Sequence, residues 1–259
     1  MAAIAATLSG VLFCVLLAPA GHAATGQRPA PPTAQPGAPP EFTRFTPAEL
    51  TRGFLALAFG SDLRVGGKPR GVRKFSGTAR VAVLEQGSVP RAAAYRAVLR
   101  EFAEKIPNLA AMPSDAPDGA NIIVRLIDEK NFVGAMEQAF GRRVARAFVA
   151  RTDPQCMTSI KSRPDGTILR ADVFIIVDQG DEVFYDCAYH ETLHAFGLSN
   201  HADNNPWTTL NQTRVVGYLT VYDRALLTML YDPRVKPGMS ASEVAKVLPA
   251  VIADLPKGD

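Results

Sequence analysis

The sequence predicts an α+β fold in which a mixed β-sheet packs against helices. Short β-branched segments are interspersed with longer stretches of helical periodicity, which predicts strands and helices in one chain. Neither an internal repeat nor a clear second apolar core is apparent. The 259 residues are 47% hydrophobic and 20% charged, an ordinary globular composition that can bury a sizeable core.

Residues 1–23 carry no charged side chain. An apolar run at 8–17 is followed by Pro19 and small residues up to Ala23, which predicts a secretory signal peptide cleaved after Ala23. The run is too short to span a bilayer comfortably, so no integral membrane span is expected after cleavage. We therefore expect an exported protein, periplasmic or extracellular.

Residues 24–41 are rich in proline and alanine with almost no large apolar residue, so we expect a flexible linker there. A single domain is expected over 42–259. It should open with a helix from Pro47 to near Gly60, because Thr46 and Glu49 form a capping box with proline at the first helical position.

The following elements are expected in order. Apolar β-branched residues predict strands at 80–84, 121–127 and 168–177, and a hairpin-type turn at 164–166 precedes the last of them. Periodic apolar residues predict helices at 89–106, 132–140, 219–231 and 240–254, whereas 144–150 is ambiguous. One further helix should open at residues 180–182, with Asp181 as a candidate cap, and should end at Gly197.

The second half of that helix and the residues after it form the most informative stretch of the sequence. It spans residues 187–203 and reads CAYHETLHAFGLSNHAD. His190 and His194 lie one turn apart on one helical face, with Glu191 beside them, which is the HExxH pattern of a zinc site with a general base. Of the four histidines in the chain, all except His22 fall between 190 and 201. The alternative is a buried amphipathic helix with two satisfied imidazoles. The clustering favours Zn²⁺, held by the histidines, with Glu191 as the catalytic base.

The stretch from His190 to Gly197 is similar to the opening of the metzincin signature, HExxHxxGxxH, whose last histidine is the third ligand. Here the matching position is Asn200, and the histidine comes one residue later. We rank His201 first as third ligand, Asp203 second and Asn200 last, since a neutral amide oxygen is a poor zinc ligand. In the segment 219–231, Asp223 followed by a helix ending in Leu-Tyr also resembles the C-terminal helix of metzincins.

Over most of the mature chain, the order of elements resembles an uncharacterised family of exported bacterial proteins, a domain of unknown function with a zincin-like helix. The residues that carry this resemblance are 72–75 (VRKF), 187–198 and 230–239 (LYDPRVKPGM). The resemblance implies a zincin-like fold with a metal-bearing helix. Both histidines and Glu191 are present here, which favours a metal-competent member.

Signal cleavage would remove Cys14 and leave Cys156 and Cys187, and an even count in an exported chain favours a disulfide between them. The bridge would join the start of the metal helix to the segment before it. Two buried free thiols are the alternative.

These observations predict an exported zinc-dependent hydrolase. Among hydrolases they favour a peptidase, which would act on peptide or protein substrates. The alternative is a non-catalytic envelope binding protein in which zinc is structural or absent. A net charge of +3 and the lack of a basic stripe with interleaved aromatic residues give no support for nucleic-acid binding.

Overall fold

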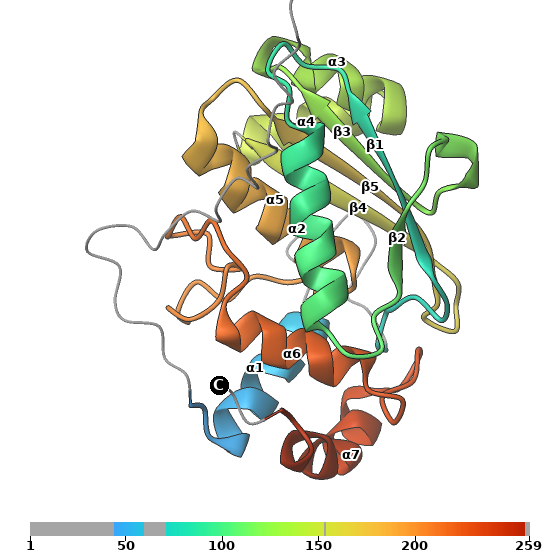
Figure 1. Ribbon diagram of the computed structural model, residues 1–259, viewed down its shortest axis with the longest axis vertical. Helices are drawn as coiled ribbons and strands as arrows, with labels where there is room; N and C mark the ends of the chain where they lie inside the picture. Colours follow the sequence, from blue (N-terminus) through green and yellow to red (C-terminus); the bar gives the residue numbers. More distant parts are fainter. Residues whose placement is uncertain (1–43, 60–70, 153, 257–259) are drawn as a thin grey trace, which may run out of the picture. The chain divides into compact units, whose positions relative to one another are not determined.

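A five-stranded mixed β-sheet forms the centre of the computed structural model, which describes residues 44–59, 71–152 and 154–256 (Figure 1). The strand order is β2-β1-β3-β5-β4. The first four of these strands run parallel, and β4 pairs antiparallel with β5 at the edge. The strands are β1 Ala79–Glu85, β2 Ala111–Pro113, β3 Ile122–Ile127, β4 Cys156–Ser162 and β5 Ile168–Ile176.

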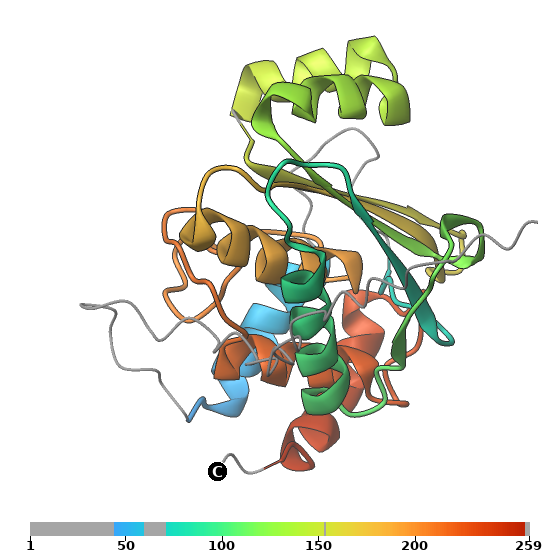
Figure 2. The same cartoon turned by 45° about the horizontal axis from the view of Figure 1, so that its top comes forward.

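Helices cover both faces of this sheet (Figure 2). The helices are α1 Pro47–Phe59, α2 Ala92–Lys105, α3 Glu129–Phe140, α4 Arg142–Thr152, α5 Asp181–Ala195, α6 Val221–Tyr231 and α7 Ala241–Ala253. A short 3₁₀ helix, η1, spans Pro117–Gly119. The α+β fold predicted from the sequence is therefore confirmed.

The alternation of side chains along β5 divides the interior into two cores. Val173 and Ile175 join the large core formed with α1, α2, α5, α6 and α7. Phe174 and Ile176 point to the other face and join a small core with α3 and α4. Because the second half of β5 is buried on both faces, residues 173–176 read as a continuous apolar run in the sequence.

The predicted strands at 80–84, 121–127 and 168–177 and the predicted helices appear with small shifts at their ends. The ambiguous segment 144–150 is helical, within α4. Two strands were not predicted. β2 has only three residues, and the sequence of β4, CMTSIKS, lacks a regular alternation of apolar and polar residues because this strand lies at the sheet edge.

Of the two helix caps predicted from the sequence, at the starts of α1 and α5, one is confirmed and one is wrong. Thr46 and Glu49 form the predicted capping box at α1, as the Thr46 N–H donates to Glu49 Oε2 and the Glu49 N–H to Thr46 Oγ1. Asp181 is not the cap of α5: the N-cap residue is Gly180, with a φ of 94°, and the Asp181 carboxylate instead accepts from Arg91 Nη2 at 2.5 Å. Arg91 is the N-cap residue of α2, so the partner of this carboxylate comes from a distant segment of the chain.

The signal peptide at 1–23 and the linker at 24–41 lie outside the described residues, and the boundaries of the 42–259 domain stay predictions. Within the ranges that the structure describes, none of the helices has the length and apolar character needed to cross a membrane.

Candidate metal centre

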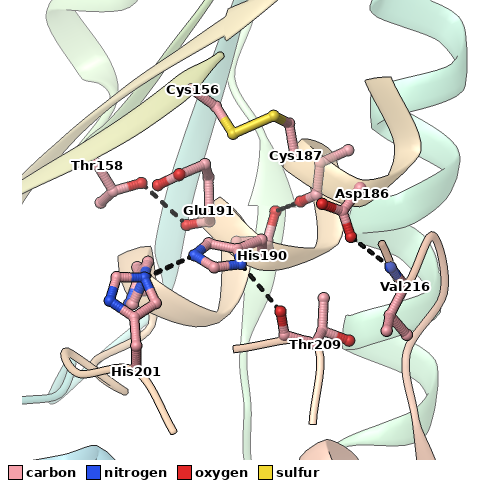
Figure 3. Close-up of a disulfide and its surroundings, with 12 residues drawn as sticks. Cys156, Thr158, Asp186, Cys187, His190, Glu191, His201, Thr209 and Val216 are labelled. Carbon is pink, nitrogen blue, oxygen red and sulfur yellow. Dashed lines mark hydrogen bonds between the residues drawn. A yellow bond between two sulfur atoms is a disulfide. The ribbon is translucent and has the colours of Figure 1, made fainter. Parts of the chain in front are cut away.

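Helix α5 carries the HExxH motif and lies against β5 and β4, where its buried face includes Ala188 and Leu193. The predicted disulfide is present: Cys156, the first residue of β4, is bonded to Cys187 with a Cα–Cα distance of 5.8 Å (Figure 3). This bond fixes the helix to the edge strand three residues before His190. The position of the first histidine relative to the sheet is thus covalently constrained.

Gly197 ends the helical region as predicted. Its φ of 117° lies in a region that side chains disfavour, and a Cβ atom there would lie 2.1 Å from the carbonyl oxygen of Arg73. The Gly197 and Leu198 N–H groups donate back to the carbonyls of His194 and Leu193, at 2.9 and 3.2 Å. Only glycine fits at this point, and the reversal returns the chain towards the two helical histidines.

Three histidine side chains converge after this reversal. The Nε2 atoms of His190 and His201 are 2.9 Å apart (Figure 3), and each lies 3.1 Å from Nε2 of His194. Within the described part of the chain, these residues form the group that could hold a metal ion. Two histidines from one helix and one from the following loop therefore present a nitrogen donor set at one point.

The backbone fixes the tautomers of the two helical histidines. His190 Nδ1 donates to the carbonyl of Thr209 at 2.9 Å, and His194 Nδ1 donates to that of Leu198 at 2.5 Å. Since a carbonyl only accepts, the proton of each neutral ring is on Nδ1, and Nε2 carries a lone pair. The 3.1 Å contact between these two Nε2 atoms is therefore a lone-pair contact in the neutral rings.

This donor set fits zinc. Nitrogens bound to one zinc ion at about 2.0–2.1 Å in a tetrahedral arrangement lie about 3.3 Å apart, close to the distances between the three Nε2 atoms. Ligating histidines in proteins commonly donate the other ring N–H to a carbonyl, as His190 and His194 do. A cation at this point would also remove the repulsion between the lone pairs.

Burial keeps the helical imidazoles neutral. It lowers the pKa of His190 to about 3, with a further contribution from His201, and it lowers the pKa of His194 well below its ordinary value. Neutral imidazole is the form that binds a metal, so at neutral pH these two rings need lose no proton first.

The loop geometry explains why the third histidine comes one residue later than in the metzincin pattern. The N–H groups of Ser199 and Asn200 both donate to the carbonyl of Leu57 at the end of α1, and Asn200 Nδ2 donates to the carbonyl of Ala56. Asn200 is therefore held against α1. The carboxylate of Asp203 is exposed and accepts from the Gln212 N–H. Of the three residues ranked for this position, the structure brings His201 to the helical pair.

A buried carboxylate orders the loop opposite His190. Asp223, which is 0% exposed, accepts hydrogen bonds from the hydroxyls of Thr208 and Thr220 and from the Thr209 N–H at 2.7 Å. The carbonyl of the same Thr209 accepts the Nδ1 proton of His190. Burial raises the pKa of Asp223 while these donors oppose the rise. The sequence resemblance singled out Asp223 as a helix residue, but nothing in the sequence indicated its link to His190 through Thr209.

Glu191 is 4% exposed and lies next to β4. Thr158 Oγ1 donates to its backbone carbonyl at 3.1 Å, and the side chain extends towards the same strand (Figure 3). Its Oε2 is buried and has no hydrogen-bond partner. Burial raises the pKa of the carboxyl group to about 8, and Asp186 adds to the rise. A buried polar atom without a partner in the protein is often paired with a bound water or ion.

Two tyrosines of α6 bond their hydroxyls to backbone carbonyls. The Tyr222 hydroxyl donates to the carbonyl of Glu49 at 3.3 Å, and the Tyr231 hydroxyl donates to that of Phe196 at 3.1 Å. Met229 of the same helix is fully buried in the large core.

Comparison with known proteins gives a match to one protein family. Residues 47–250 match the model of a protein family described as a protein of unknown function (DUF2927). The match runs from the first residue of α1 into α7 and includes the three histidines, Glu191 and both cysteines of the disulfide. A comparison with curated proteins found no match.

Proposed function

Since the chain belongs to the DUF2927 family, whose function is unknown, we propose a function from the site itself: an exported zinc-dependent hydrolase that cleaves peptide bonds. The observation that carries this proposal is the convergence of Nε2 from His190, His194 and His201 within 3.1 Å of one another. Three histidines are a typical protein ligand set of catalytic zinc, which keeps a fourth position for water, and two of the three here have tautomers fixed by the backbone.

Each residue of the site has a role in this chemistry. His190, His194 and His201 would hold the ion, which when bound acidifies water and polarises a carbonyl group. Glu191 is the proposed base, because its buried Oε2 lacks a partner and its raised pKa makes it a better proton acceptor than an exposed carboxylate. It would then return the proton to the leaving amine.

The position of β4 supports a peptide as the substrate. This strand lies at the edge of the sheet, beside α5, and no strand covers its outer side in the described ranges. An extended peptide can add to such an edge through main-chain hydrogen bonds. Thr158 of β4 donates to the Glu191 carbonyl, so a peptide along this strand would lie near the proposed base.

Export is supported by the disulfide. A Cys156–Cys187 bond is consistent with an oxidising compartment, such as the periplasm or the extracellular space. The signal peptide expected at 1–23 would deliver the chain there.

Metal analysis and hydrolysis of a peptide library test the proposal together. Purified protein should hold one zinc ion per chain and cleave peptides, and a His190→Ala, His194→Ala double variant should lose both. Glu191→Gln should keep the zinc ion and lose hydrolysis by at least about 100-fold, within the range that general-base groups contribute. Glu182→Gln, an exposed glutamate on the same helix, is the matched control and should leave both unchanged.

The outcomes separate the hydrolase from its alternative. Zinc with no hydrolysis of any peptide would favour a non-catalytic binding protein with structural zinc. Hydrolysis that persists in Glu191→Gln would reject Glu191 as the base. Absence of zinc from the wild-type protein, even after incubation with the metal, would reject the hydrolase and leave the binding protein without a metal.

A further inference from the structure

Two adjacent cations, Arg73 and Lys74, are bonded very differently. Lys74 Nζ donates to the carbonyls of Leu230, Asp232 and Val235 at 2.8, 3.2 and 2.5 Å. In contrast, Nε of Arg73 is buried and has no hydrogen-bond partner, and its guanidinium forms no ion pair with a described residue. The positive charge of Lys74 is solvated by the backbone, whereas Arg73 is partly buried and its charge has no ion-pair partner among the described residues.

The missing counter-charge distinguishes Arg73 from another partly buried arginine. Arg91 also has a buried Nε without a partner, but its Nη2 pairs with Asp181 at 2.5 Å and its guanidinium stacks over Phe184. Burial lowers the pKa of Arg73, and no neighbouring carboxylate opposes this effect. Charges that are partly removed from water in proteins are commonly paired, so Arg73 is available for an anion that the described residues do not supply.

The Arg73 backbone lies at the metal centre and is held rigidly. Its carbonyl packs against Gly197, three residues after His194, so closely that no side chain fits between them. Hydrogen bonds of 2.9 Å on both sides, from Val72 N–H to the Met239 carbonyl and from Ile168 N–H to the Lys74 carbonyl, fix its backbone.

We propose that Arg73 forms an anion subsite beside the three histidines and binds a carboxylate or phosphate group of the ligand. The planar guanidinium presents paired N–H donors that match either group. The subsite deepens the proposed hydrolase and rests on it for the identity of the ligand as a peptide. It would select anionic peptides and hold the anionic group at a fixed distance from the metal-binding nitrogens.

Titration of the full-length zinc-loaded protein with inorganic phosphate, and separately with acetate, tests the subsite directly. We expect Arg73→Gln to weaken phosphate binding by about 10- to 100-fold, the usual effect of removing a hydrogen bond to a charged group. Arg73→Lys keeps the charge but loses the paired donors, so its affinity for phosphate should lie between those of the wild type and Arg73→Gln. Arg143→Gln removes the same charge from exposed α4 on the opposite face of the sheet, and should bind as the wild type does.

Unfolding by urea distinguishes an anion subsite from a structural role. Arg73→Gln removes an unpaired buried charge, so the midpoint without ligand should stay the same or rise. A lower midpoint together with unchanged phosphate binding would assign Arg73 to the fold and overturn the subsite. Equal phosphate binding by the wild type and Arg73→Gln would also overturn it, whatever the midpoint.

Three matched peptides then identify the source of the anion: one with a free C-terminal carboxylate, one with a C-terminal amide, and an amide that carries phosphoserine. Their binding is measured to zinc-loaded Glu191→Gln protein. The subsite is supported if either anionic peptide binds more tightly than the plain amide and if this difference disappears when Arg73→Gln is added. The peptide that binds more tightly then identifies the anionic group. Equal binding of all three would overturn it for peptides.

Failure of the hydrolase and failure of the subsite give different results. If no peptide is cleaved but phosphate binding depends on Arg73, the subsite stands without the hydrolase. If the wild type cleaves peptides but Arg73→Gln binds phosphate and all three peptides as before, the hydrolase stands and the subsite is wrong.

Discussion

The candidate metal centre is built from two regions that are held in different ways. The helical half, with His190 and His194 on α5, is fixed by burial against the sheet, by the Cys156–Cys187 bond and by the glycine reversal at 197. The loop half, with His201, is fixed by polar contacts: the carbonyl of Leu57 holds the start of the loop, and Asp223 holds Thr209.

This difference sets how each half responds to change. Contacts within a helix are local and repeat every turn, so two ligands four residues apart meet whenever the helix forms. The loop ligand meets them only if hydrogen bonds to α1 and α6 form as well. We therefore expect changes in the helical half to act on folding and metal binding together, and changes in the loop half to act mainly on metal binding.

The largest expected effect follows from removing the helical ligands. Zinc at a thousand times its dissociation constant stabilises a folded protein by about 4 kcal/mol, and a His190→Ala, His194→Ala double variant should lose all of it. His201→Ala should also weaken zinc binding, by more than about 100-fold, because a ligand matters more than the outer contacts that orient it. Thermal unfolding with and without zinc measures both. A zinc-dependent rise in Tm that survives the double variant would contradict the site.

The second prediction concerns the disulfide. Cys156 and Cys187 are 31 residues apart in sequence, and a bridge over such a loop contributes roughly 3–4 kcal/mol to the free energy of unfolding. A Cys156→Ser, Cys187→Ser double variant should lose about this amount in urea unfolding at constant pH. If the helical half depends on the bridge, the variant should also bind zinc more weakly than the wild type. Equal stability of the two proteins would mean that packing alone holds α5 to β4.

Asp223→Asn tests the loop half. The asparagine keeps the shape but loses a carboxylate acceptor, so Thr209 and the ring of His190 are held less firmly. Zinc affinity should fall by about 10- to 100-fold, the range for partners that orient a ligand. Asp203→Asn is the control, since that exposed carboxylate accepts from the Gln212 N–H. Unfolding of the zinc-free protein is measured in parallel. A loss of stability with unchanged zinc affinity would mean that Asp223 stabilises the fold but does not orient a metal ligand.

The smallest expected effect is that of Thr158→Val. This isosteric change removes the hydrogen bond from β4 to the carbonyl of Glu191 but leaves the disulfide intact. A single hydrogen bond of this kind contributes about 1 kcal/mol, so the free energy of unfolding should fall by no more than that. A loss comparable with that of the disulfide variant would mean that the hydroxyl, and not the covalent bond, holds the helix to the edge strand.

The same difference between the two halves explains how much the sequence could predict. His190, His194, Gly197 and the Cys156–Cys187 pairing were predictable because spacing within a helix and an even cysteine count are local or compositional signals. Strand β4 was missed because an edge strand with polar residues lacks the apolar alternation of a buried one.

Other features depend on contacts between distant residues. The link from Asp223 to Thr209 joins residues 14 apart through a buried polar network, and Arg73 reaches the site from a segment more than a hundred residues before it. Asp181 was predicted as a cap and is instead paired with Arg91, 90 residues away. Spacing rules describe neighbours along the chain, and none of these partners is a neighbour.

The disulfide also closes a covalent ring that contains β4, the turn at 163–167, β5 and the first half of α5. All three histidines follow the ring in the sequence. A protease that cuts once inside the ring, for example at the turn, would open a loop without releasing a fragment, because the bridge still joins both ends. The histidine-bearing part of the chain would remain tethered to the edge strand after such a cut.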